Sequence, residues 1–187
     1  SHQSLLANAS HELRSPLARL KMAVSMIDGA DPARRAALQR EIDTDIAELD
    51  ALVEEVLLAS RLDGGAQALP RDPVELLGLA AEEAARFQAG VEGQTVQVAG
   101  DERLLRRALR NLLENARRYG GAEVSVELVR SSSGAEVRVC DRGPGVPEAL
   151  RERIFEPFYR LPGHAEQAGG VGLGLSLVRQ IAQRHGG

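Results

Sequence analysis

The sequence predicts a long α-helical hairpin followed by an α/β two-layer sandwich. Apolar residues recur at heptad-like steps through the first 62 positions, and a stretch rich in glycine and proline follows them. The remaining positions mix helical patterns with short alternating β patterns. A length of 187 residues suits one large domain or two small ones. We therefore expect domains at 1–62 and 74–187, joined by a linker at 63–73.

The first 62 residues predict two helices with a tight break between them. One apolar seam comprises Leu6, Leu13, Leu17, Leu20, Val24 and Ile27. Gly29 can end this helix, and Asp31 followed by Pro32 is typical of a helix N-cap with proline at the first helical position. A second helix is expected over 32–62, with a broad stripe formed by Leu38, Ile42, Ile46, Leu49, Leu52, Val53, Val56 and Leu57.

A hairpin of this length cannot bury both apolar stripes within itself. Two copies that pair into a four-helix bundle would bury them. The alternative is that the stripes pack against the second half of the chain.

The second half predicts short strands that alternate with helices. The expected elements are an extended entry and helix over 74–88, a strand over 95–99, a helix over 102–118 capped by Asp101, a β-hairpin of 122–129 and 135–141, a short helix over 147–155 and a last helix over 173–184. Between Arg86 and Gly100 we expect room for one strand only.

Composition excludes several classes of protein. The net charge of −4 argues against a nucleic-acid partner. Cys140 is the one cysteine, so no internal disulfide can form, which is consistent with a reducing compartment. We expect neither a membrane span nor a signal peptide within these residues, because they contain no run of about 18 apolar residues and no signal-peptide pattern. Aromatic residues make up only 3% of the chain, so Leu, Val, Ile and Ala must fill the core.

The stretch "NLLENARRYG" places Asn111 and Asn115 four residues apart on one helix face. Asparagine is neutral to unfavourable inside a helix, so two on one face suggest a polar ligand. A carboxamide oxygen can ligate Mg²⁺, which also binds phosphate oxygens. The alternative is a pair of solvated surface asparagines.

Two glycine-containing stretches follow. In "DRGPGVP", Asp141 ends a strand and can accept a hydrogen bond from an exocyclic amine, while Gly143 and Gly145 permit a tight turn and close backbone approach. An ordinary turn is the alternative. In "GGVGLGLSLV", glycines precede a helix start, an arrangement that suits phosphate. This stretch is neither a Walker A motif nor a Rossmann fingerprint.

The order of these stretches resembles that of the bacterial sensor histidine kinases of two-component systems. The asparagine helix, "DRGPGVP", "FEPFYR" and "GGVGLGLSLV" resemble the N, G1, F and G2 boxes of that family, and "SHELRSPL" resembles its H box. The resemblance implies a homodimeric phosphoacceptor domain and a histidine-kinase/gyrase-type ATP-binding domain. The linkage of "RLPG" to the G2 box resembles proteobacterial envelope-sensor kinases.

For the H box, the resemblance implies three chemical roles. His11 would accept the γ-phosphoryl group of ATP, and Glu12 would hydrogen-bond or take the imidazole proton. The phosphoryl group would then pass to an aspartate of a response regulator receiver domain. Ser15 stands where family members often carry Thr or Asn to orient the water that dephosphorylates the regulator. We also interpret Pro16 as a hinge beside His11, because it removes one helix hydrogen bond.

For the nucleotide, the resemblance implies an ATP site and Mg²⁺. The positions assigned to it are Asn111, Asn115, Arg118, Tyr119, Asp141, Gly143, Gly145, Gly170, Gly172, Leu173 and Gly174. Asn115 would ligate the metal with Asn111 as a helper, Arg118 would contact phosphate and Tyr119 the adenine side. Asp141 would read the adenine amino group, and the glycines would shape the pocket and admit the phosphates. Phe155, Phe158 and the chain to about 169 would form a mobile lid.

Two other functions compete with this interpretation. The ATPases of the gyrase and MutL superfamily typically carry a glutamate one turn before the metal-binding asparagine, where it activates water. Asn111 holds that position here and cannot act as a base, and Glu114 faces another direction. The second alternative is a non-catalytic dimerisation module, which the intact His11 and Asn115 disfavour.

The resemblance also sets expectations about the ends of the chain. Family members continue beyond "AQRHGG" with another hairpin and carry more residues before the H box, and Ser1-His2 resembles a tag. We therefore expect a truncated ATP-binding domain. We also expect the cytoplasmic portion of an inner-membrane sensor, which would meet the membrane only through segments absent here.

Overall fold

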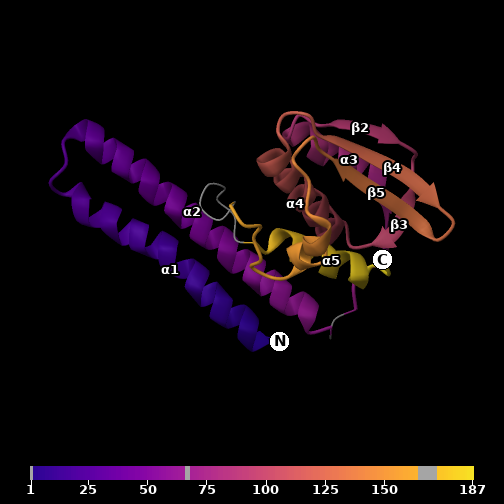
Figure 1. The fold of residues 1–187 in the computed structure, drawn as a ribbon, viewed down its shortest axis with the longest axis horizontal. Helices are drawn as coiled ribbons and strands as arrows, with labels where there is room; N and C mark the ends of the chain where they lie inside the picture. The colour runs from indigo at the N-terminus through magenta and orange to yellow at the C-terminus, as the bar shows by residue number, and fades with distance from the viewer. Residues whose placement is uncertain (1, 66–67, 164–171) are drawn as a thin grey trace. The chain divides into compact units, whose positions relative to one another are not determined.

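The computed structural model describes residues 2–65, 68–163 and 172–187. The chain divides into two compact units, Ser1–Asp63 and Gly64–Gly187, which are described separately (Figure 1).

The first unit is a helical hairpin. Helix α1 spans His2–Ile27, helix α2 spans Pro32–Asp63, and the two lie side by side (Figure 1). Asp31 caps α2 as predicted, because its Oδ1 accepts a hydrogen bond of 2.9 Å from the backbone N–H of Arg34. The α1 helix continues through Pro16.

The hairpin buries only part of its apolar surface. Near the loop, Ala23, Leu38 and Ile42 form a small core. Eight larger apolar side chains of the hairpin remain between 39% and 66% exposed in the single chain: Leu6, Leu17, Met22, Val24, Met26, Ile46, Val53 and Leu57. Exposed apolar surface of this extent is typical of an interaction surface.

The second unit contains two small sheets. In the first, β1 (Asp72–Glu75) pairs antiparallel with β3 (Gln97–Gly100). In the second, β4 (Ser125–Ser131) is the central strand, with β2 (Gly90–Gly93) parallel on one side and β5 (Gly134–Cys140) antiparallel on the other.

Three helices accompany these sheets (Figure 1): α3 (Leu76–Arg86), α4 (Glu102–Gly120) and α5 (Gly174–Arg184). Val126 and Leu128 of β4 pack with Ala84 of α3 and Leu113 of α4 in one continuous core. The structure therefore confirms the predicted hairpin followed by an α/β sandwich.

Two local predictions were wrong. The segment between Arg86 and Gly100 holds two strands, β2 and β3, where one was expected. The β2 sequence "GVEG" carries one apolar residue, so its alternation is too weak to reveal a strand, and parallel pairing with β4 holds it. The predicted helix over 147–155 is a pair of 3₁₀ turns, η1 (Glu148–Leu150) and η2 (Arg153–Phe155).

A buried carboxylate joins α3 to α4. Glu83 is 1% exposed, and both of its oxygens accept hydrogen bonds of 3.1 Å from Arg110. Arg106 adds a bond of 3.2 Å. Burial alone would raise the pKa of Glu83, but the hydrogen bonds from Arg110 and Arg106 outweigh it, and the pKa lies below its usual value of 4.5.

We expect Glu83→Gln to lower the free energy of unfolding of this unit by about 2 kcal/mol at pH 7, because the two arginines lose their buried partner. Since the folded-state pKa is depressed, the contribution of Glu83 is present above the unfolded pKa and is lost as the pH falls through the folded value. Both tyrosines of the chain, Tyr119 and Tyr159, lie in this unit, so tyrosine fluorescence during urea unfolding follows it alone.

Glu82→Gln is the matched control for this prediction. Glu82 also pairs with Arg106, at 2.7 Å, but its side chain is 65% exposed, and its loss should cost less than about 0.5 kcal/mol. Two results would contradict the assignment. One is an equal decrease in the free energy of unfolding in the two variants. The other is that Glu83→Gln loses stability at acidic pH in the same way as the parent.

Candidate active site

Two of the three candidate residues of the hairpin, His11 and Ser15, share one face of α1. His11 and Ser15 are both exposed and stand four residues apart, and Glu12 beside them is half-buried. His11 is therefore open to solvent on the helix surface, as a phosphoacceptor must be.

Arg19 lies one further turn along the same face and was not anticipated from the sequence. Its Nη1 donates to the Ser15 Oγ at 3.2 Å. Its Nε and Nη2 reach α2, at 3.1 Å from Asp45 Oδ1 and 2.7 Å from Glu48 Oε2. The hydrogen bond to Asp45, opposed by burial and helped by the charges of Glu48 and Asp45, raises the pKa of Arg19. The spacing of four residues from Ser15 was the available signal.

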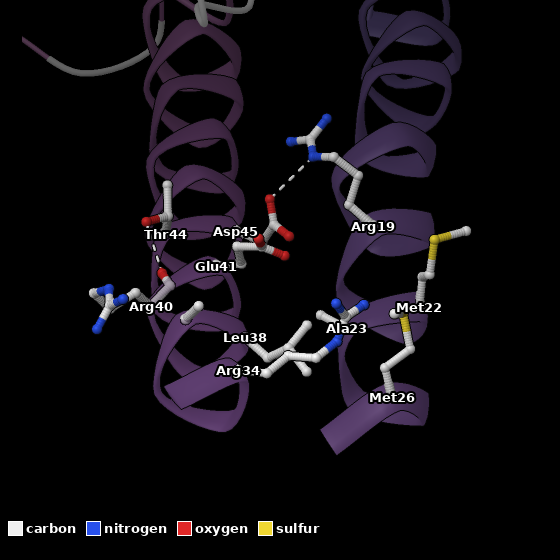
Figure 2. Close-up of a pocket in the computed structure, with 11 residues that line it drawn as sticks. Arg19, Met22, Ala23, Met26, Arg34, Leu38, Arg40, Glu41, Thr44 and Asp45 are labelled. Carbon is white, nitrogen blue, oxygen red and sulfur yellow. Dashed lines mark hydrogen bonds and ion pairs between the residues drawn. The ribbon is translucent and has the colours of Figure 1, made fainter. Parts of the chain in front are cut away.

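A groove of about 650 Å³ lies between α1 and α2 beside this arginine. Figure 2 shows that Arg19 points across it toward Asp45, while Met22 and Met26 line the α1 side. Its lining includes none of the site residues predicted from the sequence.

The two asparagines of α4 have different surroundings. Asn115 is half-buried, and within the described residues its carboxamide has no hydrogen-bond partner. Asn111 is 5% exposed, and its Nδ2 donates to the backbone oxygen of Gly174 at 3.2 Å. Asn111 therefore joins α4 to the first residue of α5, and the alternative of a solvated surface residue is excluded. Its role beside the phosphates stays a prediction.

Asp141 is held against the C-terminal end of α4. Its Oδ1 accepts a hydrogen bond of 2.8 Å from the N–H of Gly143. A Cβ on Gly143 would stand 2.6 Å from the Tyr119 carbonyl oxygen, and a Cβ on Gly120 would stand 2.2 Å from the Asp141 Cβ. Both positions require glycine, because the backbone after β5 lies too close to the end of α4 to leave room for a Cβ.

Gly120 was missed by sequence reasoning. It follows Tyr119 at the end of α4, and its carbonyl accepts a hydrogen bond of 3.3 Å from the N–H of Arg142. The glycine pair at the end of the asparagine motif was the available signal. Gly145, which the sequence did predict, has a φ of +75° and makes the expected turn. Arg118 is exposed and Tyr119 half-buried in the last turns of α4.

The described part of the G2 stretch meets the F stretch. Phe158 donates its N–H to the carbonyl oxygen of Gly172 at 2.9 Å. Both residues have left-handed backbones, with φ of +65° and +76°, and a Cβ on Gly172 would stand 2.9 Å from the Phe158 Cα. Leu173 is fully buried. Gly170 and the end of the predicted lid lie outside the described residues.

Helix α5 is held to α4 at both of its ends. Asn111 binds its first residue, and His185 lies just beyond its last. The His185 Nε2 accepts from the N–H of Asp101 at 3.0 Å, and Nδ1 lies 2.7 Å from the Ile181 carbonyl oxygen. These contacts require the neutral tautomer with its proton on Nδ1. The segment after the glycines is thus fixed to the helix that carries Asn115.

Arginines cover two of the three aromatic rings of the F stretch. The guanidinium carbon of Arg179 lies 4.6 Å from the centre of the Phe155 ring, and that of Arg153 lies 4.6 Å from the Tyr159 ring. Arg179 also donates to Glu152 at 2.6 Å. These contacts fix the beginning of the predicted lid to α5.

The residues present fit a nucleotide with Mg²⁺. Within the described residues, no three His, Cys, Asp or Glu side chains gather to hold a metal. The carboxamide oxygen of Asn115 would give a magnesium ion one protein ligand, and phosphate and water would supply the other oxygens. The carboxylate of Asp141 offers a hydrogen-bond acceptor that suits the amino group of an adenine-type ring, and the nearby glycines leave space beside it.

Both halves of the chain match family models. Residues 1–65 match the "His Kinase A (phospho-acceptor) domain", and residues 100–187 match the "Histidine kinase-, DNA gyrase B-, and HSP90-like ATPase". The first match contains His11 and Ser15, and the second contains Asn115 and Asp141.

Similar proteins agree with these matches. Sensor protein RstB of Escherichia coli is 39% identical over the whole of this chain, and sensor histidine kinase CpxA of the same species is 33% identical. The chain spans 45% and 43% of their lengths. The solved mycobacterial sensor histidine kinase MprB is 32% identical, with a TM-score of 0.55 over 62% of this chain and 80% of that one.

A further solved structure supports the fold alone. Acinetobacter baumannii histidine kinase AdeS is 21% identical and has a TM-score of 0.72 over 93% of this chain and 86% of that one.

The fold and site thus define a phosphoacceptor hairpin joined to an ATPase-type sandwich. The chain belongs to the sensor histidine kinases, as the sequence predicted. Of the described helices, none is long and apolar enough to span a membrane.

Gly120→Ala should weaken nucleotide binding about tenfold, because the added methyl group would displace Asp141 and overpacking of this kind costs about 1–3 kcal/mol. Titration with a fluorescent ATP analogue measures the change. Gly90→Ala is the matched control, since a Cβ there meets nothing within 4 Å. If Gly120→Ala binds the analogue as tightly as the parent does, Asp141 does not bind the nucleotide in the proposed way.

Proposed function

We propose that this chain transfers the γ-phosphoryl group of ATP to His11 and then to an aspartate of a response regulator receiver domain. One observation carries the proposal: an exposed His11 followed by Glu12 within the phosphoacceptor match, in a chain whose second unit matches the ATPase family.

The chemistry at His11 is a nucleophilic displacement. One ring nitrogen of the neutral imidazole forms a bond to the γ-phosphorus, and the bond from that phosphorus to the β–γ bridging oxygen breaks, releasing ADP. The proton on the other ring nitrogen passes to Glu12, one residue along the helix. Because His11 is exposed, the γ-phosphate can reach its imidazole without a conformational change in the hairpin.

The sandwich supplies binding and orientation. Asp141 accepts a hydrogen bond from the adenine amino group, and the backbones of Gly143 and Gly145 shape that pocket. Asn115 would ligate Mg²⁺, which would neutralise charge on the phosphates when bound. We assign the phosphates to the side of the site that carries Arg118, Gly172 and Gly174. Phosphoryl transfer then depends mainly on positioning and charge neutralisation.

Transfer to a protein is favoured over hydrolysis of ATP. A hydrolase needs a base one turn before the metal-binding asparagine, and Asn111 offers only a carboxamide. That carboxamide is buried and hydrogen-bonded to Gly174. No carboxylate replaces it at that position, so water has no base there.

The chain acts as a homodimer in this proposal. The eight exposed apolar side chains of the hairpin support it, because a second copy would bury them in a four-helix bundle. A receiver domain would then dock on the bundle near His11, and Ser15 would orient water for dephosphorylating it. The chain would lie in the cytoplasmic part of an inner-membrane sensor.

Incubation with labelled ATP and Mg²⁺ tests the central step. The parent chain should acquire a label that is labile in acid and stable in alkali, as a phosphohistidine is, and His11→Gln should acquire none. His11→Gln should still bind the fluorescent ATP analogue, which shows that the loss lies at the acceptor.

Two outcomes would contradict the proposal. ATP consumption without any label on the protein would indicate an ATPase. Bound nucleotide with neither label nor consumption would indicate a non-catalytic module.

Val53→Glu should raise the dimer dissociation constant at least about tenfold, because it places a charge where apolar surface is to be buried. Val53 is 46% exposed in the single chain. Sedimentation equilibrium measures the change. Glu54→Gln, at the neighbouring exposed position, should leave the constant within about twofold. A parent that sediments as a monomer, or equal effects of both substitutions, would rule out this dimer surface.

A further inference from the structure

Arg19 connects Ser15 to the opposite helix through three separate nitrogen atoms. Its Nη1 donates to the Ser15 Oγ, its Nε to Asp45 and its Nη2 to Glu48. A guanidinium is planar and its donors point in fixed directions. Two carboxylates on α2 therefore set the plane of the group, and that plane directs the remaining N–H at the serine hydroxyl.

The two α2 carboxylates that hold Arg19 differ in burial. Asp45 is 7% exposed, although it is an acidic residue, and it faces Arg19 across the groove between the helices (Figure 2). Glu48 lies one turn further along α2 and makes the shorter bond, at 2.7 Å. Charged pairs of this kind hold a guanidinium better than a single exposed pair does, because the two bonds share one rigid group.

Ser15 needs an external restraint of this kind. It is exposed, so packing does not hold its side chain. Threonine at a helix position has a restricted χ1 because its Cβ carries two heavy atoms, and serine lacks the second one. The hydroxyl of Ser15 could therefore turn away from a water molecule, and the N–H of Arg19 opposes that rotation.

We propose that Arg19 is a positioning residue for Ser15 and fixes the rotamer in which the hydroxyl orients water toward a phosphorylated receiver aspartate. The proposal rests on the phosphatase role proposed for Ser15. A hydroxyl has one donor and two acceptor sites. Arg19 occupies one acceptor site and leaves the O–H and the other lone pair for water.

The arrangement makes the orientation of Ser15 depend on how α1 and α2 pair. Ser15 and Arg19 belong to α1, whereas Asp45 and Glu48 belong to α2. A shift of one helix along or around the other would move the guanidinium and release the hydroxyl. The phosphatase step would respond to such a shift more strongly than the step at His11, for which no contact with Arg19 is required.

A double-mutant cycle between Arg19→Ala and Ser15→Thr tests the proposal in the 187-residue chain. The substrate is the receiver domain that accepts phosphate fastest from His11 within a panel of receiver domains, phosphorylated beforehand with phosphoramidate. The quantity compared is the dephosphorylation rate divided by the autophosphorylation rate of the same preparation. A general loss of folding cancels in this ratio.

Arg19→Ala should lower the ratio about fivefold in the parent and less than about twofold in the Ser15→Thr background, because loss of one hydrogen bond costs roughly 1 kcal/mol where no methyl group restrains χ1. Asp45→Asn should lower it in the same direction, since it removes the charge that anchors Arg19. Arg40→Ala is the matched control. Arg40 lines the same groove, and its substitution should change the ratio less than about 1.5-fold.

Side-chain NMR of selectively labelled serine gives a second readout that does not require a receiver domain. The Hα–Hβ couplings of Ser15 should indicate one dominant χ1 rotamer in the parent and averaging in Arg19→Ala. Equal fold losses in the two Ser15 backgrounds would overturn the proposal, as would identical couplings in parent and variant. A parent that dephosphorylates no receiver would refute the phosphatase role instead, and the couplings would still decide whether Arg19 fixes the rotamer.

Discussion

The nucleotide-binding unit depends on a close backbone approach at the C-terminal end of α4. Gly120 and Gly143 carry no side chain, and for that reason the loop after β5 can bring Asp141 against the helix that carries Asn115. One close contact thereby fixes the positions of Asp141 and Asn115, which are expected to bind opposite ends of a nucleotide, relative to each other. The same helix holds α3 through Glu83 and α5 through Asn111. Most of the unit is therefore positioned relative to α4, and a disturbance at its end would reach both the residue proposed to bind adenine and the residue proposed to bind the metal.

The hairpin follows a different physical rule. Its buried apolar residues run from Leu5 to Leu62 and include a cluster near the loop, but much apolar surface remains exposed on α1 and α2. Charged contacts add to the pairing of the two helices: Arg19 meets both Asp45 and Glu48 from the neighbouring helix. Charged pairs hold direction well but add little stability when exposed. In the proposed homodimer, these polar contacts would set the geometry of the hairpin and the second copy would cover its remaining apolar surface.

The sequence was sufficient for the long helices, the Asp31 cap and the order of the motifs. Heptad spacing, the Asp31-Pro32 cap and the order of the glycine stretches predicted the hairpin, the sandwich and the family. It was insufficient where a contact joins distant positions. Strand β2 is held by pairing with β4, Gly120 is required by Asp141, and Arg19 is oriented by α2. Asn111 was correctly singled out, but its bond to Gly174 spans 63 positions and no local pattern encodes it.

The contact between Phe158 and Gly172 has a consequence for how the chain between them can vary. One hydrogen bond and two left-handed residues bring the ends of this segment together. Closing a loop costs only about 0.6 kcal/mol more for each doubling of its length. Insertions and deletions between these two residues should therefore leave the Phe158–Gly172 contact, α5 and the asparagine helix α4 in place. Gly172 itself can hardly be replaced, because its backbone is left-handed and a Cβ there would stand 2.9 Å from the Phe158 Cα.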